Sequence, residues 1–88
     1  MREKTMERSL KALANRRRLA ILGFIKKAKE AAVGNIAGEI HLSFKSTSRH
    51  LGVLAAADIL DKEQRSLKVF YRIAHDLPEL VRKILPLL

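Results

Sequence analysis

The spacing of the apolar residues changes once along this chain, and the change limits the folds open to it. Up to about residue 56, apolar residues recur every three or four positions, which is the period of a helix that buries one face. Further along, Val69, Tyr71 and Ile73 take every second position, which is the period of a β-strand. The sequence therefore predicts several helices followed by a β-hairpin late in the chain.

Capping residues and turns set the expected boundaries. Asn15 and Ser43 each precede a helical pattern and have side-chain oxygens that can accept a bond from a free backbone N–H group. Asp76 is expected to cap the last helix in the same way, with Pro78 in its first turn. We expect helices at about 3–14, 16–29, 33–40, 44–56 and 76–86, and strands at about 59–63 and 68–74. The predicted fold class is mainly α with a small β-hairpin (α+β), in the order ααααββα.

Length and composition exclude several classes of protein. The 88 residues suffice for a single domain over 1–88, and the 18 Lys and Arg against 9 Asp and Glu favour a polyanionic partner. The chain has no cysteine, so disulfides, a thiol nucleophile and Cys-ligated metals are excluded. It has no signal-peptide pattern and no apolar run that could span a bilayer, so we expect a cytoplasmic location and no membrane partner. Because there is no glycine-rich phosphate loop and no converging Ser, His and acid set, we expect neither an enzyme nor a cofactor.

Two short helices joined by a tight turn, at about 33–56, form a helix-turn-helix pattern, and the hairpin at about 59–74 is then a wing. In the second of these helices, Thr47, Leu51 and Leu54 form the buried stripe. Residues 42–56 include two cations, at 45 and 49, and no acid. This winged helix-turn-helix pattern predicts that helix 44–56 reads the major groove of double-stranded DNA.

The candidate DNA-contacting residues lie on this helix and on the hairpin. Arg49 can form a bidentate contact with guanine, Ser43 stands at a helix start that suits a phosphate, and Lys68 can reach the backbone or the minor groove. The full set is Ser43, Phe44, Lys45, Ser46, Ser48, Arg49, His50, Arg65 and Lys68. The run Arg16–Arg18 is either a second phosphate contact or a solvated cluster in which Arg18 bridges to a nearby acid.

Apolar stripes on the first and last helices are either core or the interface of a homodimer. The candidate dimerisation residues are Met6, Leu10, Leu80, Val81, Ile84 and Leu88. A two-fold dimer would place two recognition helices about 34 Å apart, which matches one turn of DNA.

Residues from about 8 to 75 resemble the ArsR-type family of winged-helix repressors. The matching stretches are 10–14, 18–22, 42–51 and 69–73, of which the third is the most specific because it joins the capping Ser, the turn and Ser48-Arg49-His50-Leu51. The resemblance implies a homodimer that binds pseudo-palindromic operators and, in many members, releases DNA when a metal or another effector binds.

The chain also departs from the family pattern. His41 and Asp58 stand where glycine is usual, and both positions are expected to have positive φ. Ala32 and Gly34 occupy the positions of the cysteine pair of metal-sensing members, and no histidine follows His75 on the last helix, where a second type of site lies. The resemblance therefore implies no sensory metal.

Two other functions use the same fold. A winged-helix module for protein partners would tend to have an acidic or apolar second helix, whereas this one is basic and rich in hydroxyl groups. Phe44 could contact either a thymine methyl group or a protein. A nonspecific nucleic-acid binder would use stacking aromatics, and only Phe44, Phe70 and Tyr71 are available.

Overall fold

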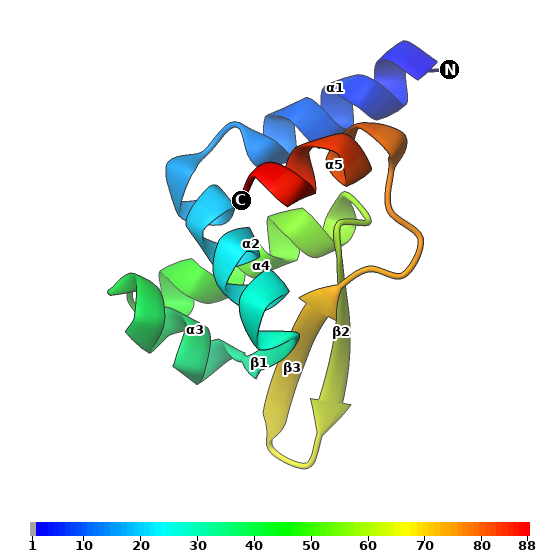
Figure 1. Ribbon diagram of the computed structural model, residues 1–88. Helices are drawn as coiled ribbons and strands as arrows, with labels where there is room; N and C mark the ends of the chain where they lie inside the picture. The colour runs from blue at the N-terminus through cyan, green and yellow to red at the C-terminus, as the bar shows by residue number, and fades with distance from the viewer. Residues whose placement is uncertain (1) are drawn as a thin grey trace.

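In the computed structural model, which describes residues 2–88, helices surround one side of a small antiparallel sheet (Figure 1). The helices of this part of the chain are α1 (Arg2–Leu13), α2 (Arg16–Ala28), α3 (Val33–Ile40), α4 (Phe44–Ala56) and α5 (Glu79–Ile84), followed by a 3₁₀ turn, η1 (Leu85–Leu87). The strands are β1 (Glu30–Ala32), β2 (Leu60–Arg65) and β3 (Lys68–Ile73), in the spatial order β1-β3-β2. The order ααβααββα confirms the predicted class and adds one strand to it.

Strand β1 is the element that the sequence did not predict. It pairs antiparallel with β3, so that Glu30 faces Arg72 and Ala31 faces Tyr71. Three residues are too few to show an alternating pattern, and alanine is depleted in strands. The strand forms because β3, far along the chain, supplies its hydrogen-bond partners.

Local interactions at the helix ends agree with the sequence. Asn15 Oδ1 accepts bonds from the N–H groups of Arg17 and Arg18, at 3.0 and 3.1 Å, and Ser43 Oγ accepts one from Ser46 N at 3.0 Å. The expected positive φ angles are confirmed, at 57° for His41 and 62° for Asp58.

The prediction for the last helix is wrong at its start. Helix α5 begins at Glu79, after an extended Pro78, and Asp76 does not cap it. A cap at Asp76 would require Leu77 to be helical, and the residue before a proline is disfavoured in that conformation. The hairpin turn is also tighter than expected, because β2 continues to Arg65 and only Ser66 and Leu67 connect it to β3.

The core is aliphatic and lies between α2, α3, α4 and the inner face of the sheet. Tyr71 packs into it from β3, and Val81 reaches it from α5. The largest fully buried hydrophobic side chains are Ile21, Leu22, Ile25, Ile36, Leu51, Leu54, Ile59 and Val81. Within residues 2–88, none of the helices combines the length and the hydropathy that crossing a bilayer requires.

Candidate nucleic-acid interface

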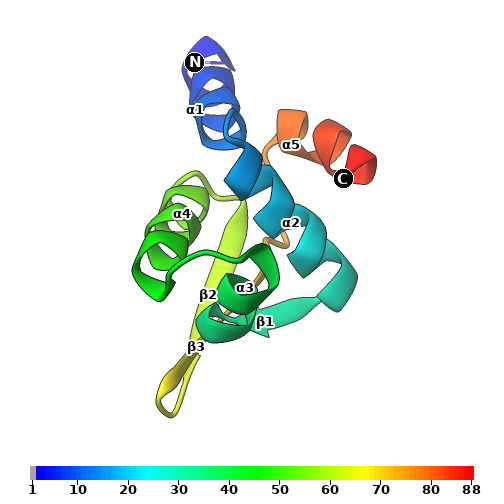
Figure 2. The same ribbon diagram turned by 90° about the vertical axis from the view of Figure 1, so that its left-hand side faces the viewer.

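The turn between α3 and α4 sets the orientation of α4. His41 adopts the left-handed conformation at the end of α3, and Leu42 N then donates to Ala37 O at 3.0 Å. Beyond the turn, Thr47, Leu51 and Leu54 are fully buried, so the opposite face of α4 is left at the surface. In Figure 2, α4 lies along one side of the molecule and the β2–β3 hairpin extends away from the helices.

The structure brings most of the candidate residues of α4 to this surface. Ser43, Phe44, Lys45, Ser48 and Arg49 are exposed, whereas Ser46 and His50 are half-buried. Lys45 and Arg49 are four residues apart on one helix and therefore neighbours. Within residues 2–88, neither cation has an ion pair or a side-chain hydrogen bond. Both are therefore available to an anion.

Arg18 contacts neither a phosphate site nor an acid, the two alternatives expected from the sequence. Its guanidinium donates to Ala12 O at 2.6 Å and to Lys11 O at 3.0 Å, at the end of α1, and approaches His50 Nδ1 at 3.2 Å. Since an arginine only donates, Nδ1 of His50 accepts and the imidazole is neutral. The expectation that Arg18 bridges to an acid is therefore wrong, because backbone carbonyls and an imidazole satisfy it.

The other two arginines of the run, Arg16 and Arg17, add positive charge to the surface that carries Lys45 and Arg49. Burial lowers the pKa of the His50 imidazole, and the positive charges of Arg18, Arg17 and Arg49 lower it further. Arg17 on α2 and Arg49 on α4 thus act on the same side chain. Arg16 and Arg17 are exposed and, within residues 2–88, have no acidic partner. The sequence signal for them was the run of positive charge at a helix start, which opposes the helix dipole.

The two candidate cations of the hairpin differ from each other. Lys68 is exposed and has no partner within the part of the chain that is described. Arg65 instead forms ion pairs with Glu30 at 2.7 Å and with Glu63 at 3.0 Å. Sequence reasoning could not find the first pair, because Glu30 lies 35 residues away along the chain.

A cleft of about 340 Å³ lies between the start of α3, the first residue of α4 and the hairpin turn. Phe44 lines it from α4, and Leu67 and Val69 line it from the hairpin. Phe44 is 62% exposed and Leu67, in the hairpin turn, is 96% exposed. Phe44 and Leu67 thus lie on one surface of the molecule, and Leu67 is a surface residue that the sequence did not single out.

Helices α1 and α5 lie side by side at the end of the molecule opposite the hairpin tip (Figure 1). Met6 and Leu10 are 44% and 50% exposed, while Leu80, Ile84 and Leu88 are half-buried. Val81 is different, because it is fully buried within a single chain. Its side chain belongs to the core, and its assignment to a dimer interface is corrected on that ground.

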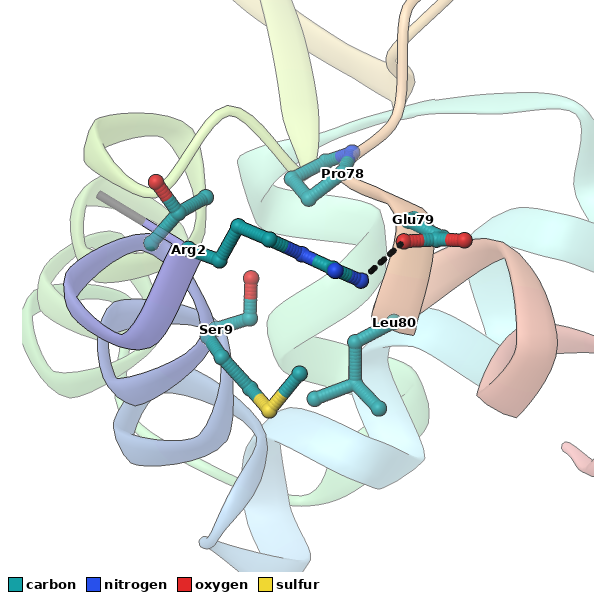
Figure 3. Close-up of a pocket in the computed structure, with 7 residues that line it drawn as sticks. Arg2, Ser9, Pro78, Glu79 and Leu80 are labelled. Carbon is teal, nitrogen blue, oxygen red and sulfur yellow. Dashed lines mark ion pairs between the residues drawn. The ribbon is translucent and has the colours of Figure 1, made fainter.

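A second cleft, of about 370 Å³, lies between α1 and α5. Arg2 and Glu79 face each other across it, with 3.9 Å between the charged groups (Figure 3). Ser9 and Leu80 also line it (Figure 3). Within residues 2–88, His, Asp and Glu side chains do not gather in threes as metal ligands would.

Solved structures of several regulators superpose on nearly the whole chain. HlyU from Vibrio cholerae has a TM-score of 0.83 and 28% identity, covering 97% of this chain and 88% of its own. A homodimeric winged helix-turn-helix DNA-binding domain, Mb0332 from Mycobacterium bovis, is described as a possible ArsR-family transcriptional regulator. It has a TM-score of 0.82 and 31% identity, covering 96% of this chain and 74% of its own. AntR, an antimony-specific transcriptional repressor, has a TM-score of 0.75 and 27% identity, covering 89% of this chain and 68% of its own.

No family model matches the sequence, and no curated protein sequence matches it either. The solved structures nevertheless establish the family, because the 31% identity to the Mycobacterium bovis domain extends over 96% of this chain. They confirm the resemblance found in the sequence, and the relatives are transcriptional regulators rather than enzymes. With its helix-turn-helix and its hairpin wing, the chain belongs to the ArsR family of winged helix-turn-helix DNA-binding transcriptional regulators.

Proposed function

We propose that this protein is a sequence-specific repressor that binds a pseudo-palindromic operator as a homodimer and reads the major groove with α4. One observation carries the proposal. The exposed face of α4 presents Lys45 and Arg49 without acidic partners within residues 2–88, while the opposite face is fully buried. An electropositive helix that is rigidly anchored and free to enter a groove is the arrangement that DNA readers of this class use.

The exposed side chains divide into two kinds of contact. Arg49 suits a bidentate contact with guanine, and Lys45 and Ser48 suit neighbouring base edges or phosphates. The hydroxyl of Ser43 is already used as a helix cap, so its contribution is the cap and the helix start behind it. The remaining proposed contacts are Phe44, Ser46, His50 and Lys68, to which the exposed Arg16 and Arg17 are now added, whereas Arg65 is already paired with Glu30 and Glu63.

The homodimer rests on the exposed apolar side chains of α1 and of the C-terminal segment. Met6 and Leu10 project from α1, and Leu87 is 79% exposed. Leu80, Ile84 and Leu88 of the C-terminal segment are half-buried. A patch of this kind needs a partner surface, and a two-fold pair would present two copies of α4 about 34 Å apart. The relative from Mycobacterium bovis is itself homodimeric.

We propose repression rather than activation because AntR, a protein of similar structure, is a transcriptional repressor. A role as a module for protein partners is less consistent with the acid-free surface of α4, although the exposed Phe44 would suit one. We also propose a cytoplasmic location. We propose no metal and no cofactor.

Selection from a pool of randomised duplex DNA, at low and at physiological salt, tests the proposal. We expect enrichment of an inverted repeat whose half-sites lie one helical turn apart. Binding that falls steeply with salt and enriches no sequence would contradict sequence-specific readout and leave only an electrostatic binder. An enriched single half-site would contradict the dimer but retain the reading helix.

A further inference from the structure

The guanidinium of Arg65 joins the two outer strands of the sheet. It donates to both carboxylate oxygens of Glu30 on β1, at 2.7 and 2.9 Å, and to Glu63 on its own strand at 3.0 Å. Arg72 on the central strand donates to the same oxygen of Glu63 at 3.0 Å. Two cations and two anions therefore form one connected network.

The strand register explains how Arg65 reaches Glu30. Strand β3 is central, with Glu30 opposite Arg72 on one side and Glu63 opposite Phe70 on the other. The side chain of Arg65 must cross β3 to reach β1. It does so over the ring of Phe70, with 4.5 Å between the guanidinium carbon and the ring centroid. The aromatic ring supports the cation as it crosses.

The network lies at the part of the hairpin that extends beyond the third strand of the sheet. Strand β1 pairs only with residues 70–72 of β3, so beyond Phe70 the hairpin has no third strand. Glu30, by contrast, is fixed to the helix-turn-helix, because β1 leads directly into α3. The Arg65–Glu30 pair is thus a polar link from the outer part of the hairpin to the part of the molecule that positions α4, beside the packing of Val69 against the core.

The direction of the Arg65 side chain separates it from the groove-facing surface. Successive residues of a strand point to opposite faces. Val69 lines the cleft beside Phe44, and Tyr71 packs into the core, so both point toward the helices. Phe70 and the Arg65 guanidinium above it therefore lie on the other face of the hairpin, whereas Lys68, next to the hairpin turn, also lines the cleft beside Phe44.

The arginines of the network favour the ionised form of both carboxyl groups. The hydrogen bonds from Arg65 lower the pKa of the Glu30 carboxyl, and those from Arg65 and Arg72 lower the pKa of the Glu63 carboxyl. A single exposed ion pair contributes little to stability, but bidentate geometry and networks are the exceptions to that rule.

We propose that Glu30 is a positioning residue for DNA binding: through Arg65 it fixes the hairpin relative to α3 and α4, and Arg65 acts through hairpin position rather than by touching DNA. The inference rests on the proposed function. It replaces direct contact by Arg65, and it gives an acidic residue outside the DNA surface a role in affinity for DNA.

The sign of one substitution tests this proposal. Near a polyanion, removing a negative charge strengthens binding by simple electrostatics. If Glu30 positions the hairpin, Glu30→Gln instead weakens binding to the selected operator, by about threefold or more. Glu39→Gln is the matched control, since Glu39 is exposed on α3 and has no partner within residues 2–88. It removes the same charge, and its affinity for the operator should be unchanged or higher.

Salt dependence distinguishes a positioning role from direct contact. Arg65→Gln should weaken binding but keep the slope of log affinity against log salt, whereas Lys68→Gln should reduce that slope by about one. The double variant Glu30→Gln/Arg65→Gln should bind no more weakly than either single variant, because both break the same link.

A readout in the free protein completes the experiment. Backbone amides of residues 66–69 should exchange hydrogen faster in Glu30→Gln than in wild type, while those of α2 stay unchanged, which shows that the fold is intact. Glu30→Gln binding as tightly as Glu39→Gln, or a salt slope that falls by about one in Arg65→Gln, would overturn the positioning role alone. Failure of the wild-type protein to bind any duplex would instead contradict the proposed function.

Discussion

Arg18 donates a hydrogen bond to Nδ1 of His50 across 3.2 Å, and this contact connects the end of α1 to the recognition helix. The same guanidinium holds two backbone carbonyls at the end of α1. One side chain on α2 thus joins a helix of the proposed dimer interface to the helix of the proposed DNA interface.

The neutral state of His50 predicts a pH dependence of stability. Its pKa in the folded protein lies below the ordinary value of 6.5, because of burial and then of Arg18, Arg17 and Arg49. Between the lowered pKa and 6.5 the unfolded chain binds more protons, so the free energy of unfolding falls as the pH is lowered through this window. Urea unfolding between about pH 7.5 and about pH 5 measures the fall. His50→Gln keeps an acceptor for Arg18 but does not titrate, so it should reduce the slope. An unchanged slope would assign the effect to another group.

Arg49 is predicted to read a base. Arg49→Ala should cost about 1–3 kcal/mol of binding to the operator and relax preference at one base pair. Arg82→Ala removes the same charge from α5, outside the proposed DNA surface, and should leave the base preference intact. Repeating the duplex selection with both variants is the measurement. If Arg49→Ala keeps the wild-type motif and affinity, α4 does not read the groove through this residue.

Leu10 is predicted to lie in the dimer interface. Its side chain is 50% exposed in a single chain, so Leu10→Glu places a charge at the interface without entering the core. We expect a shift from dimer to monomer in sedimentation, and a loss of affinity for the full inverted repeat. Leu67→Glu is the control, because Leu67 is 96% exposed in the hairpin turn and its substitution should leave the oligomeric state unchanged. A dimeric Leu10→Glu variant would move the interface elsewhere.

An apolar residue at position 47 is predicted to make the folded protein more stable than Thr47 does. It is fully buried on the core side of α4, and its Oγ1 has no hydrogen-bond partner within residues 2–88. A buried hydroxyl without a partner costs roughly 1–3 kcal/mol, so Thr47→Val should raise the free energy of unfolding by about 1 kcal/mol. Thr47→Ser keeps the hydroxyl and loses a methyl group, so it should lower stability. Chemical denaturation of both variants decides the matter, and a destabilised Thr47→Val would show that the hydroxyl has a partner.

His41 occupies a position that suits glycine. With φ at 57°, its backbone is in the left-handed region, which glycine adopts without strain and other residues do not. His41→Val should be about 1–2 kcal/mol less stable than His41→Gly, since a β-branched residue tolerates this conformation poorly. Thermal unfolding of the two variants measures the difference. Equal stabilities would mean that the turn relaxes when the side chain changes.

Interactions within a few residues were predictable from sequence because both partners stand close together in the chain. The caps at Asn15 and Ser43 bond to N–H groups two or three residues ahead. The buried stripe of α4 follows from helical spacing alone, and all three of its residues are fully buried. The residues exposed on α4 could be named for the same reason.

Contacts between distant residues were decided only by the tertiary structure. Strand β1 exists because β3 pairs with it, and Arg65 is engaged because that pairing brings Glu30 within 2.7 Å. Val81 is core rather than interface because α5 packs onto the same core as α2 and α4. The sequence by itself thus determined which helices form, where α2 and α4 begin and which face of α4 is polar, because those features depend on spacing and local capping. Which charges remain free to meet DNA depends on groups brought together from separate parts of the chain, and only the folded structure determines them.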